Sequence, residues 1–236
     1  MAIAVISDIH GNLEALTKAI DYIKAQNINE IYCLGDIVGY GPNPNECLEI
    51  VRQQCKVVLM GNHDYAAIGL ARIEYFNDFA KMATYWTMNQ LSEENKEFLR
   101  GLPFMYQTDR FIMVHASPTN PEHWYYILTM NDALIEMQSF KQNICFVGHS
   151  HVPVIFNQQT SFKNDITIEP NQKYIVNVGS VGQPRDGDPR LSFVLFDPEA
   201  GQIKYVRLKY DVNKTYEKII KSGLPPFLAE RLLKGY

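Results

Sequence analysis

The feature that most constrains the fold is a buried strand that runs directly into a polar turn and an amphipathic helix. Residues 2–6 are apolar and rich in β-branched side chains, which predicts a buried strand. Asp8-Ile9-His10-Gly11-Asn12 follows, and residues 13–26 place their apolar side chains on one helical face. Strands at 31–34 and 57–60 with a helix at 45–54 continue this β-α-β-α-β pattern. Each strand delivers Asp, Asn or His to the sheet edge where parallel α/β folds bind ligands.

The histidines of the chain are not scattered. Five of the six fall in strand-to-loop turns beside Gly, Asp or Asn, and three acidic or amide residues occupy equivalent turns. This set supplies enough nitrogen and oxygen ligands for two divalent cations, and it lacks the cysteines of a closed structural zinc site. Mixed imidazole and carboxylate ligands suit Mn, Fe, Zn, Co or Ni, and we favour manganese. The candidate ligand positions are Asp8, His10, Asp36, Asn62, His115, His149 and His151, with His63 beside them.

The rest of the chain shows no repeat, no low-complexity tract and no linker, so we expect one domain over residues 1–236. Helical patterns cover residues 65–100, within which Ser92 could cap a second helix that ends at Gly101. Helices are also predicted at 132–140 and 214–221, and a short tail with Pro225-Pro226 closes the chain. The apolar stripe Phe79, Met82, Ala83 and Trp86 is expected to face the core. Further strands are predicted at 104–108, 111–114, 144–147, 154–157, 166–169, 174–178, 191–196 and 203–208.

Composition excludes several classes of partner. The net charge of −4 gives no basis for a nucleic-acid-binding surface. No apolar run approaches the ~20 residues that span a bilayer, and the first strand lacks the features of a signal peptide. The four cysteines show no C-x-x-C spacing, and Cys33 and Cys145 lie inside predicted strands, so we expect these two to be buried thiols and the protein to reside in a reducing cytoplasm. Oligomerisation is left open.

The ordered motifs Asp8-x-His10, Gly35-Asp36, Gly61-Asn62-His63-Asp64, His115 and Gly148-His149-x-His151 resemble those of the calcineurin-like metallophosphoesterases. The resemblance implies a mixed α/β fold, a four-layer α-β-β-α sandwich of two mixed sheets with helices outside. It implies that Asp36 bridges two metals. Asp8, His10 and His151 would complete one metal shell, and Asn62, His115 and His149 the other. Ser150 stands where many relatives carry Thr.

The resemblance also implies a reaction. Two cations roughly 3.5–4 Å apart clamp a phosphate and generate hydroxide near neutral pH, so a metal-dependent phosphoric ester hydrolase is expected. His63 matches the histidine that faces the leaving oxygen, which makes it the expected general acid.

Departures from the family pattern narrow the substrate. Gly39, Tyr40 and Met60 replace an Asp and two Arg of the protein phosphatases, so what orients His63 is open and phosphoproteins are disfavoured. The chain resembles instead the small prokaryotic phosphodiesterase branch, which includes diadenosine-tetraphosphatase-like members. A small, nucleotide-like phosphorylated substrate is therefore expected. The segments that carry this resemblance, besides Asp8-Ile9-His10-Gly11-Asn12, are Gly39-Tyr40-Gly41-Pro42-Asn43-Pro44 and Asn177-Val178-Gly179-Ser180-Val181-Gly182-Gln183-Pro184-Arg185.

Several alternatives stay open. Arg185 is expected to contact substrate phosphate, unless Asp186 and Asp188 pair with Arg185 and Arg190 and only rigidify the loop. Asn12 either contacts substrate or caps the following helix. Trp124-Tyr125-Tyr126 is either a wall of the substrate site or an interface. The alternative functions are a catalytically silent scaffold that binds a protein, a phosphomonoesterase or protein phosphatase, and metal storage or sensing.

Overall fold

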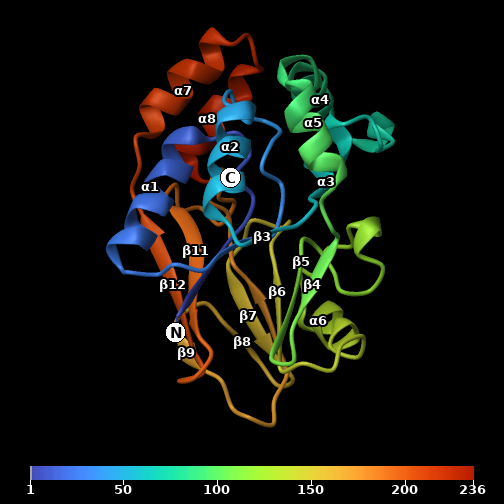
Figure 1. Cartoon of the computed structure of the whole chain (residues 1–236), viewed down its shortest axis with the longest axis vertical. Coiled ribbons are helices and arrows are strands. Elements are labelled where there is room, and N and C mark those ends of the chain that lie inside the picture. The colour runs from blue at the N-terminus through green and yellow to red at the C-terminus, as the bar shows by residue number, and fades with distance from the viewer. Residues whose placement is uncertain (1) are drawn as a thin grey trace.

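The computed structural model describes residues 2–236 and contains two six-stranded mixed sheets (Figure 1). The first sheet has the order β3-β2-β1-β11-β12-β9. β1 pairs in parallel with β2 on one side and antiparallel with β11 on the other. The first strand is therefore central in its sheet. The strands are β1 Ile3–Ile6, β2 Ile31–Cys33, β3 Val57–Val58, β9 Ile166–Thr167, β11 Leu191–Asp197 and β12 Gln202–Leu208.

The second sheet has the order β4-β5-β6-β10-β7-β8. β6 is parallel to both β5 and β10, and the remaining neighbours are antiparallel. β5 and β6 consequently end at the same edge. The strands are β4 Met105–Gln107, β5 Phe111–Val114, β6 Ile144–Val147, β7 Val154–Asn157, β8 Ser161–Phe162 and β10 Tyr174–Asn177.

The two sheets bury a common apolar core between them. Val5 and Leu34 from the first sheet pack with Phe146 and Val176 from the second, and all four are fully buried. Helices α1 (Leu13–Ala25) and α2 (Pro44–Gln54) cover the outer face of the first sheet. Helix α6 (Met130–Glu136) covers the outer face of the second. This is the expected α-β-β-α sandwich, and the fold prediction is confirmed (Figure 1).

A further group of helices lies over the end of the sheets where the predicted ligands gather (Figure 1). Its apolar core joins Tyr40 to side chains of α4, α7 and α8. The two short 3-10 helices are Ile73–Tyr75 and Pro121–His123. The helices are α3 Asn62–Ala67, α4 Asp78–Gln90, α5 Glu93–Arg100, α7 Val212–Lys221 and α8 Pro226–Lys234.

Three predictions about this helical group were wrong. Residues 65–91 do not form one helix, because α4 starts afresh where Asn77 caps it by accepting a hydrogen bond from Ala80 N–H. The second helix expected behind Ser92 is confirmed as α5, with Ser92 as its N-cap and Gly101 as its C-cap. The tail is the helix α8, with Pro226 at its first turn, a position that tolerates proline because the missing N–H would be unpaired there. Phe79 and Met82 of the stripe are 42% and 55% exposed, because the buried face of α4 is made of small residues instead. That face comprises Ala80, Ala83, Thr84 and Thr87.

The remaining sequence expectations concern thiols and membranes. All four cysteines are free thiols, and Cys33 and Cys145 are buried as predicted. Cys47 is buried as well, whereas Cys55 is half-buried. Among residues 2–236, no helix has the length and apolar character needed to cross a membrane.

Candidate metal centre

The predicted ligands meet at one edge of the sandwich. Asp8 and Asp36 follow β1 and β2, and Asn62 starts α3 just after β3. The second sheet brings His115 after β5, with His149 and His151 after β6. Parallel strands within each sheet end at the same edge, so residues more than 140 positions apart become neighbours. All seven candidate ligands lie within this cluster or beside it.

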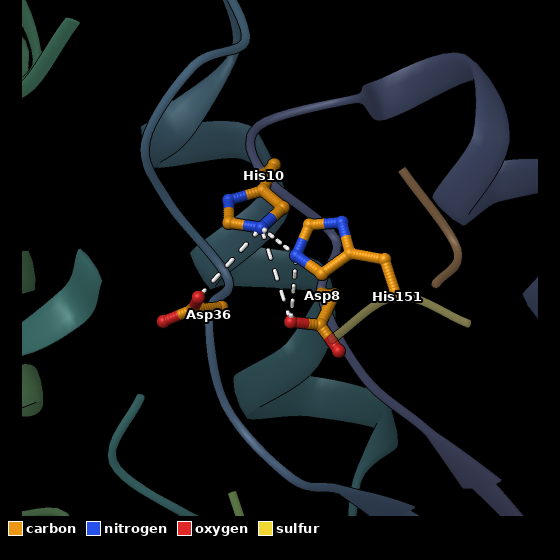
Figure 2. A group of neighbouring side chains, drawn as sticks. All are labelled: Asp8, His10, Asp36 and His151. Carbon is orange, nitrogen blue, oxygen red and sulfur yellow. Dashed lines mark hydrogen bonds and ion pairs between the residues drawn. The ribbon is translucent and has the colours of Figure 1, made fainter. Parts of the chain in front are cut away.

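The first group of candidate ligands comprises Asp8, His10, Asp36 and His151 (Figure 2). His151 Nε2 lies 3.2 Å from Asp8 Oδ1, and His10 Nε2 lies 3.7 Å from Asp36 Oδ2. The two imidazole nitrogens, His10 Nε2 and His151 Nε2, are 3.1 Å apart. One ligand atom from each residue fits within 4.8 Å of the others. Such convergence of buried nitrogen and oxygen atoms suits a divalent cation.

The second group shares Asp36 with the first. Asp36 joins His115 and His149, again with one ligand atom of each within 4.8 Å of the others. His115 Nε2 lies 3.3 Å from Asp36 Oδ2 and 3.2 Å from Asn62 Oδ1. Asp36 is thus the carboxylate common to both groups, the position that the resemblance gives to the bridging ligand.

Unpaired buried atoms show that these residues fit a cation. Among the described residues, Asp8 Oδ1, Asp36 Oδ2 and His149 Nε2 are buried without a hydrogen-bond partner. Two carboxylate oxygens and an imidazole nitrogen are costly to bury unpaired. Metal coordination would satisfy all three, because each offers a lone pair to the same small region.

The opposite atoms of these side chains are fixed by the surrounding loops. Asp8 Oδ2 accepts a hydrogen bond from the backbone N–H of His149, and Asp36 Oδ1 accepts one from His63 N–H. His10 Nδ1 and His151 Nδ1 lie 3.1 and 2.6 Å from the carbonyl oxygens of Val38 and Gln183. Such outer contacts orient the coordinating atoms inward.

The backbone at the ligands is unusual. Asp8, His10, Asp36, His149 and His151 all have positive φ, between 50° and 64°. A left-handed conformation costs about 1–2 kcal/mol for an L-residue with a side chain, although Asp, Asn and His tolerate it best. Close backbone approach adds a further restriction, since a Cβ on Gly61 would lie 2.2 Å from Asp36 Oδ1. Residues that adopt strained backbone together are typical of functional sites.

Charges within the cluster perturb one another. Burial alone would favour the neutral acid at Asp8, but the adjacent His151 and His115 lower the pKa of that carboxyl overall. Burial disfavours a charged His115, yet the adjacent Asp36 carboxylate dominates and raises the pKa of His115 to about 9. Coordination of a cation would require the neutral form of His115, because a metal binds the deprotonated ring nitrogen.

Comparison with known proteins agrees with this geometry. Residues 1–201 match the calcineurin-like phosphoesterase superfamily domain. The chain belongs to the calcineurin-like phosphoesterase superfamily. This membership, together with the Asp and His groups that could hold metal, supports a phosphoester hydrolase.

Individual relatives extend the comparison over the whole chain. An uncharacterized protein of Methanocaldococcus jannaschii is 42% identical over 99% of this chain and 98% of its own. The crystal structure of a metallophosphoesterase from Sphaerobacter thermophilus has a TM-score of 0.90 at 38% identity, covering 100% and 99% of the two chains. A symmetrical bis(5'-nucleosyl)-tetraphosphatase of Haemophilus ducreyi is 26% identical over 82% of this chain and 72% of its own.

His63 of this phosphoesterase stands beside the candidate ligands but outside both ligand groups. Its ring packs against Tyr40, His10 and Phe76, at centroid distances of 4.5, 5.1 and 5.2 Å. Among the described residues, His63 Nδ1 has no hydrogen-bond partner, so the neighbouring rings are the contacts that position the imidazole. Burial, with a contribution from Arg185, lowers the pKa of His63 to about 4, so the free ring is neutral at pH 7.

Asp64 has a role that sequence reasoning missed. Its buried carboxylate accepts hydrogen bonds from the N–H groups of Ile37, Val38 and Gly61. It therefore ties the loop that carries Asp36 to the start of α3, the helix that carries His63. Burial, reinforced by the nearby Asp36 charge, raises the pKa of Asp64 to about 7. An acidic residue three positions after a glycine at a helix start was the available signal.

Asn12 is a helix cap. Its Oδ1 accepts hydrogen bonds from Ala15 N–H and the Thr215 hydroxyl, and its Nδ2 donates to Gly182 O and the Tyr210 hydroxyl. The side chain is 2% exposed and its polar atoms are all engaged. The expected contact between Asn12 and substrate is therefore not available, and the alternative of a cap is the one observed.

The loop that contains Arg185 is held by ion pairs, but these differ from the expected pairing of Asp186 and Asp188 with Arg185 and Arg190. Asp188 pairs with Arg190 as that alternative supposed, but Asp186 pairs with Arg207. Arg185 instead donates to Gln183 Oε1 at 2.8 Å, and its guanidinium lies 5.9 Å from the centre of the Tyr40 ring. Its charge lowers the pKa of both His63 and His151, where burial is the largest cause. Arg185 therefore lies close enough to the candidate metal centre for its charge to act on His63 and His151.

A cleft of about 490 Å³ opens beside the cluster, with Asn62, His63 and His149 among its lining residues. Trp124 and Tyr126 line the same cleft, whereas Tyr125 lies outside it with its hydroxyl 3.0 Å from His123 Nδ1. The three consecutive aromatic residues therefore differ in their surroundings, and two of them border the space next to the candidate ligands.

Proposed function

We propose that this phosphoesterase hydrolyses phosphodiester or nucleotide phosphoanhydride bonds with two divalent cations, preferably manganese. The observation that carries the proposal is that buried Asp36 belongs to both ligand groups. The two groups also draw on both sheets, which supports treating residues 1–236 as one domain.

In this proposal Asp8, His10, Asp36 and His151 hold one cation, and Asp36, Asn62, His115 and His149 hold the other. Two such cations offset the charge of a phosphate and lower the pKa of water to near neutrality. The protein contributes fixed ligand atoms, because the backbone contacts at Asp8 and Asp36 leave one oxygen of each facing the centre.

His63 is the proposed general acid for the leaving oxygen. Its ring is neutral in the free protein because burial lowers its pKa to about 4. A phosphate anion beside the ring would raise that pKa, since an adjacent opposite charge favours the protonated form. In this role His63 would have to be protonated when the substrate is bound, with the phosphate as the negative charge that favours that form.

Arg185 is the proposed contact for substrate phosphate. It has no carboxylate partner among the ion pairs of the described residues, and it borders the Tyr40 and His63 rings. A guanidinium without a carboxylate partner can bind phosphate oxygens through two parallel N–H donors. The named activity of the tetraphosphatase from Haemophilus ducreyi further supports a nucleotide-like substrate.

The test is metal-loaded protein assayed against phosphomonoesters, phosphodiesters and dinucleoside polyphosphates, with elemental analysis of the same samples. We expect two manganese ions per chain and the fastest turnover on diesters or dinucleoside polyphosphates. A maximum of one bound ion under saturating manganese would contradict the two-cation site. Preference for phosphoproteins or simple monoesters would contradict the substrate assignment.

A further inference from the structure

The cleft beside the candidate metal centre has a wall of aromatic rings. Tyr65, Phe76, Trp124 and Tyr126 all line it, together with Tyr40. The same cleft is lined by Asn62, His63 and His149. A group attached to a phosphate at the centre would therefore meet flat apolar surfaces.

Trp124 is held in place from several sides. Its ring lies 5.7 Å from Phe104, 6.2 Å from Tyr65 and 5.9 Å from His115, measured between centroids. Its backbone is left-handed with φ 57°, and Asn120 of the same loop has φ 48°. A tryptophan in this conformation is strained, so the surrounding contacts must hold it there. The indole is thus fixed before any ligand binds.

Tyr126 forms the part of the wall nearest the ligands. Its ring stacks on the His149 ring with centroids 4.0 Å apart and an interplanar angle of 25°. It is nevertheless 51% exposed, so the face turned away from His149 is open to the cleft. Burial raises the pKa of the Tyr126 hydroxyl, and the charge of Arg185 opposes the increase.

Polar side chains at the rim complete the surroundings of the wall. Arg72, Asn77 and Glu122 line the same cleft and are exposed. They offer donors and acceptors of the kind that pair with the edge of a planar heterocycle. Aromatic side chains bind nucleobases by stacking, which tolerates any base because every base has a π-face.

We propose that Trp124 and Tyr126 form a nucleobase-binding subsite, so that the preferred substrates are nucleoside phosphate esters rather than sugar or alkyl phosphates. This deepens the proposed function and rests on it, because the base must be attached to the phosphate that the centre cleaves. Trp124 and Tyr126 act here as specificity-determining residues.

Binding can be tested without turnover by tryptophan fluorescence. The chain has two tryptophans, and Trp86→Phe leaves Trp124 as the single reporter. In zinc-loaded protein, we expect AMP to quench the Trp124 signal with saturation and ribose 5-phosphate to leave it unchanged. Equal effects of AMP and ribose 5-phosphate, or no effect of either at concentrations that inhibit hydrolysis, would overturn the subsite.

Measurements of kcat/KM then distinguish the contribution of the Tyr126 ring from that of the neighbouring residues. Tyr126→Ala should lower kcat/KM about 5- to 100-fold on a dinucleotide, the range expected for one lost stacking contact, mainly through a higher KM. Tyr126→Phe keeps the ring and should retain most of the activity. Tyr125→Ala is the matched control, since Tyr125 is equally exposed at 51% but lies outside the cleft, and it should match the parent.

An abasic analogue of the dinucleotide distinguishes the two levels of the proposal. If the parent hydrolyses the abasic analogue as well as the dinucleotide and Tyr126→Ala changes neither rate, the subsite is wrong and the phosphodiesterase proposal stands. If the loaded parent hydrolyses neither compound while AMP still quenches Trp124, the base subsite stands and the proposed phosphodiesterase reaction is wrong.

Discussion

The floor and the wall of the cleft differ in their burial and in the structural elements that carry their residues. By floor we mean the candidate ligands at the strand ends beside the cleft, of which Asp8, Asp36 and His115 are at most 1% exposed. The wall consists of loop and helix residues such as Tyr126, which is 51% exposed. The floor is fixed by pairing of the two sheets, whereas loops tolerate change more readily than strands. Under the proposed function, the floor would determine the type of reaction and the wall would determine the choice of substrate.

The largest effect is expected when the floor loses the residue shared by both groups. Asp36→Ala should remove both cations and exceed the ~10–100-fold loss typical of an outer contact to a metal ligand. Elemental analysis and kcat/KM measure this directly. His10→Ala is the comparison, because His10 belongs to the first group only and the second cation should persist. Near-native activity in Asp36→Ala with complete loss in His10→Ala would show that Asp36 is not shared.

An intermediate effect is expected at His63, where floor and wall meet. His63→Ala should keep the metals but lose about 10²–10⁴-fold in kcat, the usual contribution of general acid catalysis. The loss should shrink for a substrate that releases p-nitrophenol, which leaves without a proton. Equal losses on activated and unactivated substrates would assign His63 to positioning. A melting curve controls for the packing that His63 shares with Tyr40 and Phe76.

The smallest of these effects is expected at Arg185, on the rim. Loss of one charged hydrogen-bond contact to phosphate should lower kcat/KM roughly 10- to 100-fold in Arg185→Ala, with metal content unchanged. Arg190→Ala is the matched control, because Arg190 is paired with Asp188 on the same loop. Equal losses in both variants, or an early melting transition in Arg185→Ala alone, would make the loop purely structural.

Much of the floor could be predicted because its signals are local. Asp8-Ile9-His10 follows a recognisable strand, and so do Asp36, Asn62, His115 and His149. The pattern indicates that each residue leaves a strand, and the topology of parallel strands brings the ends together. The left-handed backbone at Asp8 and His151 carries no comparable signal, because it is imposed by contacts with distant segments.

The wall and its supporting helices were less predictable, because tertiary contacts decide them. Pro225-Pro226 indicated a tail, yet the apolar residues Leu228 and Leu232 dock on the core that contains Tyr40 and form α8. The helical spacing of Phe79 and Met82 suggested burial, but both face outward. Tyr125 and Tyr126 are adjacent and chemically identical, so only the path of the backbone distinguishes the cleft residue from its neighbour.

The central place of β1 in its sheet has a consequence for the order of folding. The turn that carries Asp8 is closed by the Ser180 hydroxyl and Gly182 N–H, which both donate to Asp8 O across more than 170 residues of sequence. Contacts between residues so far apart in the sequence form slowly, because closing the intervening loop costs conformational entropy before the contact can stabilise the fold. Asp8 is synthesised first among the candidate ligands, but it would be among the last to reach its final position. Metal uptake would mark completion of folding, and a stalled chain would carry an incomplete centre.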